Sequence, residues 1–323
     1  MRATSDAWST LPERNRPPHN PLIDNGNLRD LATWKVLVVL FVGALIGFTV
    51  LFADAPSWDH HHRVAARSAA VVLWAALMCM QTALWALALV WLLPIIRTLP
   101  AEYSRANRSE IVGSSLAILA ILVCLSVASM LHRMWPNYLP GHAAKLGVLT
   151  ILGGLVGLVA ARGVWIVHGG LKVLRRQLGT EESLQTFLSL RDHLQRFLAV
   201  LGAIIGLLVL STGAQRRAVL SYSPKTHYGF ELVLVYGFGF TILVAAVYLP
   251  TYLTLADVGV RLRDTLFPPV PTSDPGWGDT ADKREKLSRI LALDQGPLGQ
   301  LKAGVAILTP LLGSLVGLLL NAK

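Results

Sequence analysis

Long apolar stretches alternate with short polar ones along this chain, and the apolar stretches have the length of membrane crossings. A helix needs about 20 apolar residues to cross a hydrocarbon core of about 30 Å. Seven stretches approach or reach this length: residues 36–52, 69–93, 111–131, 146–167, 197–213, 232–253 and 303–320. They are too long and too uniformly apolar for the alternating strands of a membrane barrel. The pattern predicts an all-α, polytopic transmembrane helix bundle with about seven crossings.

The first polar segment, residues 1–33, contains four prolines and only scattered large apolar residues. Such a segment cannot bury enough surface to fold alone, so we predict a disordered cytosolic tail. A signal peptide is the competing interpretation, because Ala53-Asp54-Ala55 follows the first apolar run. That run is longer than a signal-peptide core and starts far into the chain, and Pro56 would follow the cut. These features favour a membrane crossing over a signal peptide for the first run. We therefore predict a transmembrane region of six helices at residues 34–253.

A second helical signal lies between the fourth and fifth runs. Gly179 is a typical helix stop, Thr180 is a candidate N-cap, and Glu181 and Glu182 would occupy a favourable first turn. Apolar residues then recur at helical spacing without a breaker until the fifth run. They are Leu184, Phe187, Leu188, Leu194, Phe197 and Leu198. We therefore predict a cytosolic helical stalk at residues 170–196, continuous with the fifth crossing.

The segment at residues 254–302 continues the sixth run beyond the membrane. Pro268 and Pro269 end that helix, residues 268–278 read as a Pro/Gly linker, and residues 279–293 form an amphipathic helix. Its predicted apolar face carries Leu287, Ile290 and Leu291. Residues 303–320 follow as the seventh crossing, although the proline near its centre leaves a segment lying in the membrane interface as the alternative.

Composition and charge support a membrane protein and give it an orientation. The chain is 53% hydrophobic and 15% charged, against about 25% charged residues in soluble domains. Of its 29 Lys and Arg residues, 21 fall on the side of the N-terminus and 8 on the other side, counted across seven crossings. Cytosolic loops carry this excess, so we predict a cytosolic N-terminus, an outside C-terminus and a plasma-membrane location. The net charge of +10 then faces anionic lipid, and the partners we predict include the bilayer but no nucleic acid.

The densest set of metal-binding residue types is Asp59-His60-His61-His62, in the loop after the first run. Imidazole and carboxylate groups suit zinc or a similar cation. Adjacent residues rarely all reach one ion, however, so an ordinary solvated loop is the favoured interpretation. We predict no cofactor and keep these four residues as weak metal candidates.

A few residues in the apolar runs could line a pathway or serve packing. Gln81 lies in the middle of the second run, and Arg162 interrupts the fourth, where it can extend to the headgroups. In the sixth run, Glu231 is followed by an aromatic and glycine-rich stretch. Glycines beside aromatic residues can mark a broken helix that lines a pathway, or a site of close packing. The residues concerned there are Glu231, Tyr236, Gly237 and Gly239.

Four runs contain glycines four residues apart, which lie on one helix face and allow backbones to approach. The pairs are Gly43/Gly47, Gly153/Gly157, Gly202/Gly206 and Gly313/Gly317. They favour tight helix packing, either within the chain or between copies of it.

No enzyme motif occurs in complete form. The chain has no His-Glu-x-x-His, no Gly-x-Ser-x-Gly, no Walker loop and no Gly-x-Gly-x-x-Gly that opens a helix. We therefore expect a non-enzymatic membrane module that relays a signal or engages a partner through its cytosolic helices. The partner would be a cytosolic protein or a second copy of the chain. A channel or small-solute transporter, favoured by Gln81 and the sixth run, is the alternative.

Overall fold

A computed structural model describes residues 33–131, 140–222 and 230–293 of the protein. Every regular element in these ranges is a helix and no strand occurs in them, so the predicted all-α class is confirmed. The elements are α1 (Thr33–Phe52), the 3-10 turn η4 (Ala55–Ser57), α2 (His60–Ala66), α3 (Ala69–Thr98), α4 (Ala101–Ala106), α5 (Arg108–Leu131), α6 (His142–Leu174), α7 (Glu181–Tyr222), α8 (Phe230–Leu266) and α9 (Trp277–Leu291).

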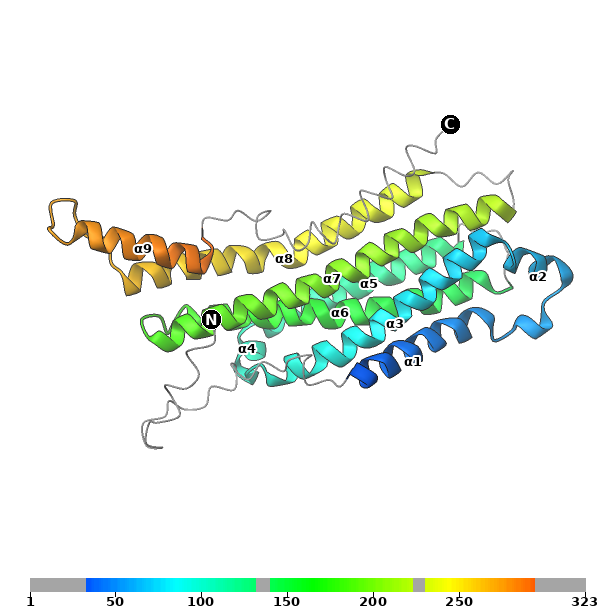
Figure 1. Ribbon diagram of the computed structural model, residues 1–323, viewed down its shortest axis with the longest axis horizontal. Coiled ribbons are helices and arrows are strands. Elements are labelled where there is room, and N and C mark those ends of the chain that lie inside the picture. The colour runs from blue at the N-terminus through cyan, green and yellow to red at the C-terminus, as the bar shows by residue number, and fades with distance from the viewer. Residues whose placement is uncertain (1–32, 132–139, 223–229, 294–323) are drawn as a thin grey trace.

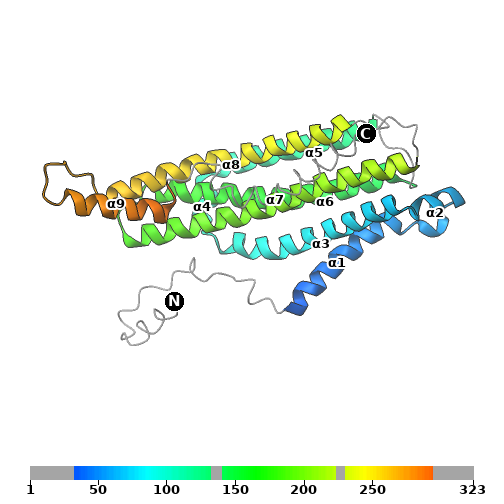
Figure 2. The same ribbon diagram turned by 45° about the horizontal axis from the view of Figure 1, so that its top comes forward.

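The long helices form an elongated bundle and run roughly along its long axis (Figures 1 and 2). The helices α9 and α2 lie at opposite ends, which we call the α9 end and the α2 end. At the centre, α6 contacts α3, α5, α7 and α8, whereas α1 packs mainly on α3 at one edge. The bundle core is therefore built around α6 and α7.

Five helical segments are long and apolar enough to cross a membrane: Thr33–Ser57, Ala69–Thr98, His142–Leu174, Glu182–Ser221 and Leu243–Leu266. They include five of the seven predicted crossings. The third predicted crossing, residues 111–131, is helical as part of α5, but its side chains are described only in part. The seventh, at residues 303–320, and the predicted tail up to residue 32 lie outside the described residues. A bundle of seven crossings is thus not confirmed.

Two helices are much longer than a membrane crossing needs. At about 1.5 Å per residue, the 42 residues of α7 extend about 63 Å and the 37 residues of α8 about 55 Å. Helix α7 begins at Glu181, as the sequence predicts, and the Ser183 amide donates a 3.3 Å hydrogen bond to Thr180 Oγ1. The predicted stalk boundary differs in one respect, because residues 170–174 are the last turn of α6 rather than the start of a separate piece.

Short helices occupy two connections that show no periodic apolar pattern. The connection after α1, expected to be a simple solvated loop, contains η4 and α2. The Asp59 carboxylate caps α2 by accepting a 2.8 Å hydrogen bond from the His62 amide. Helix α4, which the sequence analysis did not predict, follows α3 and is held by tertiary contacts of Tyr103. Helices α2 and α4 have only seven and six residues, so neither contains enough turns to show a repeating apolar pattern.

Aromatic side chains of α7 pack into glycine positions of its neighbours near the α9 end. Phe187 and Phe197 are both fully buried. A β-carbon at Gly163 of α6 would collide with the Phe197 ring, and one at Gly259 of α8 would lie 3.1 Å from Phe187 Cζ. These glycines therefore allow α6, α7 and α8 to pack closely around large rings.

The predicted amphipathic helix exists as α9, two residues earlier than expected. Leu287 and Leu291 are buried, but Ile290 is 54% exposed, so its assignment to the apolar face is wrong. The buried face is rotated toward Ser288, whose hydroxyl lies 3.4 Å from Arg263 Nη1 of α8. The side of α9 that meets the bundle therefore carries Leu287, Ser288 and Leu291.

Candidate functional site

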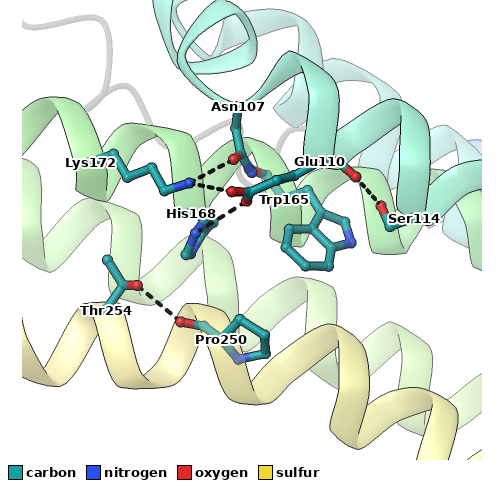
Figure 3. Close-up of polar contacts among 8 residues, drawn as sticks. All are labelled: Asn107, Glu110, Ser114, Trp165, His168, Lys172, Pro250 and Thr254. Atoms are coloured by element: carbon teal, nitrogen blue, oxygen red, sulfur yellow. Dashed lines mark hydrogen bonds and ion pairs between the residues drawn. The ribbon is translucent and has the colours of Figure 1, made fainter.

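A polar cluster joins α5 to α6 at the α9 end of the bundle (Figure 3). Lys172 Nζ of α6 donates a 2.7 Å hydrogen bond to Glu110 Oε1, in the first turn of α5. His168 Nε2, one turn earlier on α6, lies 3.5 Å from Glu110 Oε2. Lys172 Nζ also donates to Asn107 Oδ1 at 3.0 Å. The cluster therefore fastens the start of α5 to the end of α6.

Asn107 reaches this cluster because α4 lies against α6. The Tyr103 ring packs on Gly170, and a β-carbon at Gly169 would collide with the Tyr103 carbonyl. Asn107 directly follows α4, and its Nδ2 donates a 3.1 Å hydrogen bond to the carbonyl oxygen of Trp165. The two adjacent glycines of α6 thus permit the approach that positions the amide.

The charges in this cluster neutralise each other. The Glu110 side chain is 45% exposed and lies just before the predicted crossing at residues 111–131. Partial burial acts to raise the pKa of this carboxyl, but the hydrogen bond and positive charge of Lys172 outweigh burial and keep the pKa below its ordinary value. Glu110 is therefore ionised at neutral pH and pairs with Lys172, which makes the cluster a helix clamp rather than an isolated buried charge.

A proline-containing turn of α8 faces the cluster from the other side of His168 (Figure 3). Pro250 lies inside α8, and Thr254 Oγ1 donates a 3.0 Å hydrogen bond to the Pro250 carbonyl. In this turn α8 contributes neutral groups only, so the ionic contacts of the cluster belong to α5 and α6.

The α2 end has a second clamp on α6. Lys145 Nζ lies 2.6 Å from Asp54 Oδ1, donates to the Leu51 carbonyl at 2.9 Å and sits 5.1 Å from the centre of the Trp58 ring. These partners all belong to the end of α1 and the connection that follows it. A lysine near each end of α6 therefore ties this central helix to a different neighbour.

Between the two clamps, the bundle contains a partly open apolar cavity of about 80 Å³ beside Gln81. Gln81 is fully buried, and neither its Oε1 nor its Nε2 has a hydrogen-bond partner among the described residues. Trp85, one turn later on α3, also lines the cavity, and its indole N–H is likewise buried without a partner. The described residues therefore provide an apolar cavity with unpaired polar groups of α3 at its wall.

The weak metal candidates do not converge on one site. His62 Nδ1 lies 2.6 Å from Asp59 Oδ1, while His60 and His61 are exposed on α2. In residues 33–131, 140–222 and 230–293, no three His, Cys, Asp or Glu side chains are placed to hold a metal ion. The His62 amide hydrogen bond lowers the pKa of Asp59 despite slight desolvation, and the His62 ring adds to the effect. The carboxylate acts as a helix cap.

The other pathway candidates are dispersed. Arg162 is exposed on α6, consistent with a side chain that extends to the headgroups. The backbone of α8 is continuously helical across Tyr236, Gly237 and Gly239, with no broken turn. The side chains of these residues and of Glu231 lie outside the described part of the chain, so their part in a pathway stays a prediction.

The paired glycines differ in their surroundings. A β-carbon at Gly43 would lie 2.7 Å from Ala83 Cα, and one at Gly47 3.1 Å from Cys79 Cα, so both face α3. A β-carbon at Gly153 would lie 2.5 Å from Trp85 Cζ2. A β-carbon at Gly157 would meet no described atom within 4 Å, and Gly157 borders the cavity. On α7, Gly206 is buried and Gly202 half-buried. Gly313 and Gly317 lie outside the described residues.

At the α9 end, the first turns of α7 (residues 181–196), the last turns of α8 (residues 254–266) and α9 form a unit that we call the α9 cap. Arg284 Nη2 of α9 lies 2.6 Å from Asp264 Oδ1 of α8, and Arg284 also donates to the Phe267 carbonyl. Arg191 Nη1 of α7 donates a 2.8 Å hydrogen bond to the Ile290 carbonyl. Polar contacts from both long helices thus hold α9 in place above the buried Leu287 and Leu291.

Sequence reasoning missed the polar cluster at the α9 end. Glu110 and Lys172 are 62 residues apart, and each alone is an ordinary charged residue next to an apolar run. Only the approach of α4 to Gly169 and Gly170 brings them together. In contrast, the sequence alone could have predicted that Trp85 lies beside Gln81, because a spacing of four residues places both side chains on one helix face.

Comparison of the chain with known protein families, with curated proteins and with solved structures found no match. The functional interpretation therefore rests on the cap, the cavity and the clamps.

Proposed function

We propose that this chain is a non-enzymatic, multi-pass protein of a bacterial plasma membrane that engages a protein partner through the α9 cap. The observation that carries the proposal is the docking of α9 across the ends of α7 and α8 by Arg284 and Arg191. A docked amphipathic helix presents a fixed surface, and a fixed surface loses less entropy on binding than a mobile one. The partner is a cytosolic protein or a second copy of the chain.

The length of α7 supports a cap that stands away from the bilayer. Membrane helices tilt by up to about 40°, and at that tilt a helix of about 63 Å still extends about 48 Å along the membrane normal. The hydrocarbon core takes about 30 Å of this. About 18 Å of helix remains for the two ends of α7 together, so part of residues 181–196 stands outside the core even at this tilt.

The charge distribution supports a cytosolic cap. The 21 to 8 division of Lys and Arg favours a cytosolic position for the N-terminus, the α9 end and residues 254–302. With α5 and residues 303–320 as further crossings, the proposed bundle has seven crossings and an outside C-terminus. Arg216 and Arg217, in the last turns of α7, oppose this orientation but are outnumbered.

The outer face of the α9 cap has the character of a binding surface. Trp277 in the first turn of α9 is 45% exposed, and Ile290 near the end of the helix is 54% exposed. Charged side chains accompany them, and two internal ion pairs, Lys283–Asp279 and Arg289–Glu285, hold four of these charges along the helix. Exposed apolar anchors within a polar rim are typical of protein interfaces.

A channel or small-solute transporter is the second candidate, and the buried, unpaired Gln81 is the observation that favours it. Three features weigh against it. The cavity beside Gln81 is lined by apolar side chains and glycines apart from Gln81, Trp85 and Thr150. The charges of Glu110 and Lys172 pair with each other, and α8 has no unwound turn within Phe230–Leu266.

The proposal is tested by photocrosslinking in intact cells. The photoreactive amino acid p-benzoylphenylalanine replaces Ile290 on α9 or, as the matched control, Thr272 in the exposed linker outside the cap. We expect a discrete crosslinked product for the Ile290 variant and little or none for the Thr272 variant. A product of about twice the chain mass of 35.0 kDa would indicate a second copy as partner. Absence of any product at Ile290, with normal amounts of protein in the membrane, would contradict the proposal.

A further inference from the structure

The cavity beside Gln81 lies at the middle of the bundle, far from the α9 cap, and the proposed function does not use it. It has walls from five helices. Representative lining residues are Trp85 of α3, Ile118 of α5, Gly157 of α6, Leu201 of α7 and Val247 of α8. The lining is mainly apolar, so an occupant must be mainly apolar as well.

The buried polar groups of this cavity that lack a partner among the described residues come from one face of α3. Gln81 and Trp85 are four residues apart, both are buried, and both line the cavity. Together they present the amide Oε1, the amide Nε2 and the indole Nε1, none of which has a hydrogen-bond partner among the described residues. Buried polar groups are nearly always hydrogen-bonded in native proteins, so three unpaired atoms at one cavity point to a missing partner.

The depth of Gln81 limits what that partner can be. Gln81 is the central residue of the apolar run at residues 69–93, which places it near the bilayer midplane. A phospholipid headgroup stays at the interface and does not reach this depth. An ion is disfavoured, because the lining includes no charged side chain.

The space itself comes from glycine positions on α6. A β-carbon at Gly157 would have no atom within 4 Å, and Gly154 also lines the cavity. Gly153 in the same turn is instead filled by the Trp85 ring, which fixes the indole beside the opening. The cavity therefore combines open volume with a rigidly placed donor.

We propose that this cavity binds a lipophilic molecule with a hydroxyl or carbonyl oxygen that meets Gln81 and Trp85. The oxygen accepts hydrogen bonds from the amide Nε2 or the indole Nε1, and a hydroxyl also donates to the amide Oε1. The apolar remainder of the molecule occupies the space beside Gly157. Two classes of membrane-soluble molecule carry this chemistry: membrane quinones, with their carbonyl oxygens, and long-chain or polycyclic alcohols.

The test uses purified full-length protein in lipid nanodiscs and three probes of similar chain length. The probes are 1-dodecanol, 2-decyl-1,4-benzoquinone and dodecane, and the readout is the Tm of the protein. The variants are Gln81→Leu, which keeps the volume but removes the amide, and Met80→Leu, an adjacent control on the exposed face of α3. We expect at least one oxygen-bearing probe to raise the Tm of the wild type and Met80→Leu by about 3 °C or more, with no rise for dodecane.

In Gln81→Leu the rise should disappear, while the Tm without probe should equal or exceed that of the wild type because no unpaired amide remains. A response to the alcohol alone or the quinone alone identifies the source. The proposal is overturned if dodecane stabilises as well as the oxygen-bearing probes, or if Gln81→Leu responds like the wild type. It is also overturned if no probe stabilises the wild type, since water or another segment of this chain would then fill the cavity.

Discussion

Arg284 of α9 lies 2.6 Å from Asp264 of α8, and this ion pair joins two segments that the prolines at 268 and 269 separate along the chain. Arg284 also donates to the Phe267 carbonyl, so one guanidinium closes the turn from α8 to α9. Both side chains are partly exposed, which limits the contribution of the pair to about 1 kcal/mol. The α9 helix is therefore held by modest forces that a single substitution can change.

The first prediction is that Arg284→Gln releases α9 from the bundle more often. Ser288 is 7% exposed on the docked face, so a Ser288→Cys reporter should react slowly with a thiol reagent in detergent solution. Removing both Arg284 contacts should raise the labelling rate about five- to tenfold, the equivalent of about 1 to 1.4 kcal/mol. Lys283→Gln is the control, because Lys283 pairs with Asp279 within α9 itself. If the Ser288→Cys reporter reacts at the same rate with and without Arg284→Gln, then Arg284 does not hold α9 against the bundle.

The second prediction concerns the contact between α1 and α3. A β-carbon at Gly43 would lie 2.7 Å from Ala83 Cα, so Gly43→Ala must push the two backbones apart. We expect a loss of about 1–3 kcal/mol, seen as a lower Tm in detergent. Gly113→Ala on α5 is the control, since a β-carbon there meets nothing within 4 Å. A Tm for Gly43→Ala at or above that of Gly113→Ala would refute the close packing of α1.

The third prediction is a pH dependence at the α5–α6 clamp. Because the pKa of Glu110 in the folded protein lies below the ordinary value of 4.5, its contribution to stability is complete above about pH 4.5 and is lost as the pH falls through the folded pKa. The wild type should be more stable than Glu110→Gln at pH 6, and the difference should shrink between about pH 4.5 and pH 3. Thermal unfolding across this range is the measurement, with the exposed Glu102→Gln as control. A constant difference down to pH 3 would disprove the role of the ionised carboxylate.

The fourth prediction tests the proposed orientation. His61 at the α2 end and Asp282 at the α9 end are both exposed. In intact cells a membrane-impermeant maleimide should label a cysteine at position 61 and not one at position 282, which should react only after permeabilisation. The wild type, with its own two cysteines, provides the background. The reverse pattern would overturn the cytosolic assignment of the α9 cap.

The sequence predicts the parts of this fold that depend on local signals. Glu181 begins α7 because Thr180 caps it, although the preceding helix α6 already ends at Leu174 and not at the predicted stop Gly179. Helix α8 ends at Leu266 just before two prolines. The long apolar runs likewise correspond to long helices. Length, capping residues and breakers act within a few neighbouring positions, so one-dimensional reasoning captures them.

What the sequence does not predict depends on contacts between distant segments. The apolar pattern predicts Ile290 on the buried face of α9, but Ser288 occupies that face in its place, in contact with Arg263 of α8. Gly163 and Gly259 lie outside any paired-glycine motif, yet they accommodate the rings of Phe197 and Phe187. The apolar residues of a short helix define a broad face, and only tertiary partners decide which part of it is buried.

The candidate sites show the same division. Gln81 was singled out because an amide in the middle of an apolar run is conspicuous, whereas the cavity beside it requires five helices to be placed around Gly157. The histidine string attracted attention by composition, but adjacent residues on α2 point in different directions. The Glu110–Lys172 pair had no local signal at all.

The most direct test of the central claim, that the docked α9 presents a surface for a protein partner, is the yield of the photocrosslink at Ile290 with and without Arg284→Gln. The account predicts a clear product in the wild-type background and a several-fold lower yield when α9 is released, with Lys283→Gln leaving the yield unchanged. A yield that is undiminished by Arg284→Gln, in protein whose Ser288→Cys reporter shows α9 released, would contradict the claim that the docked helix forms the binding surface.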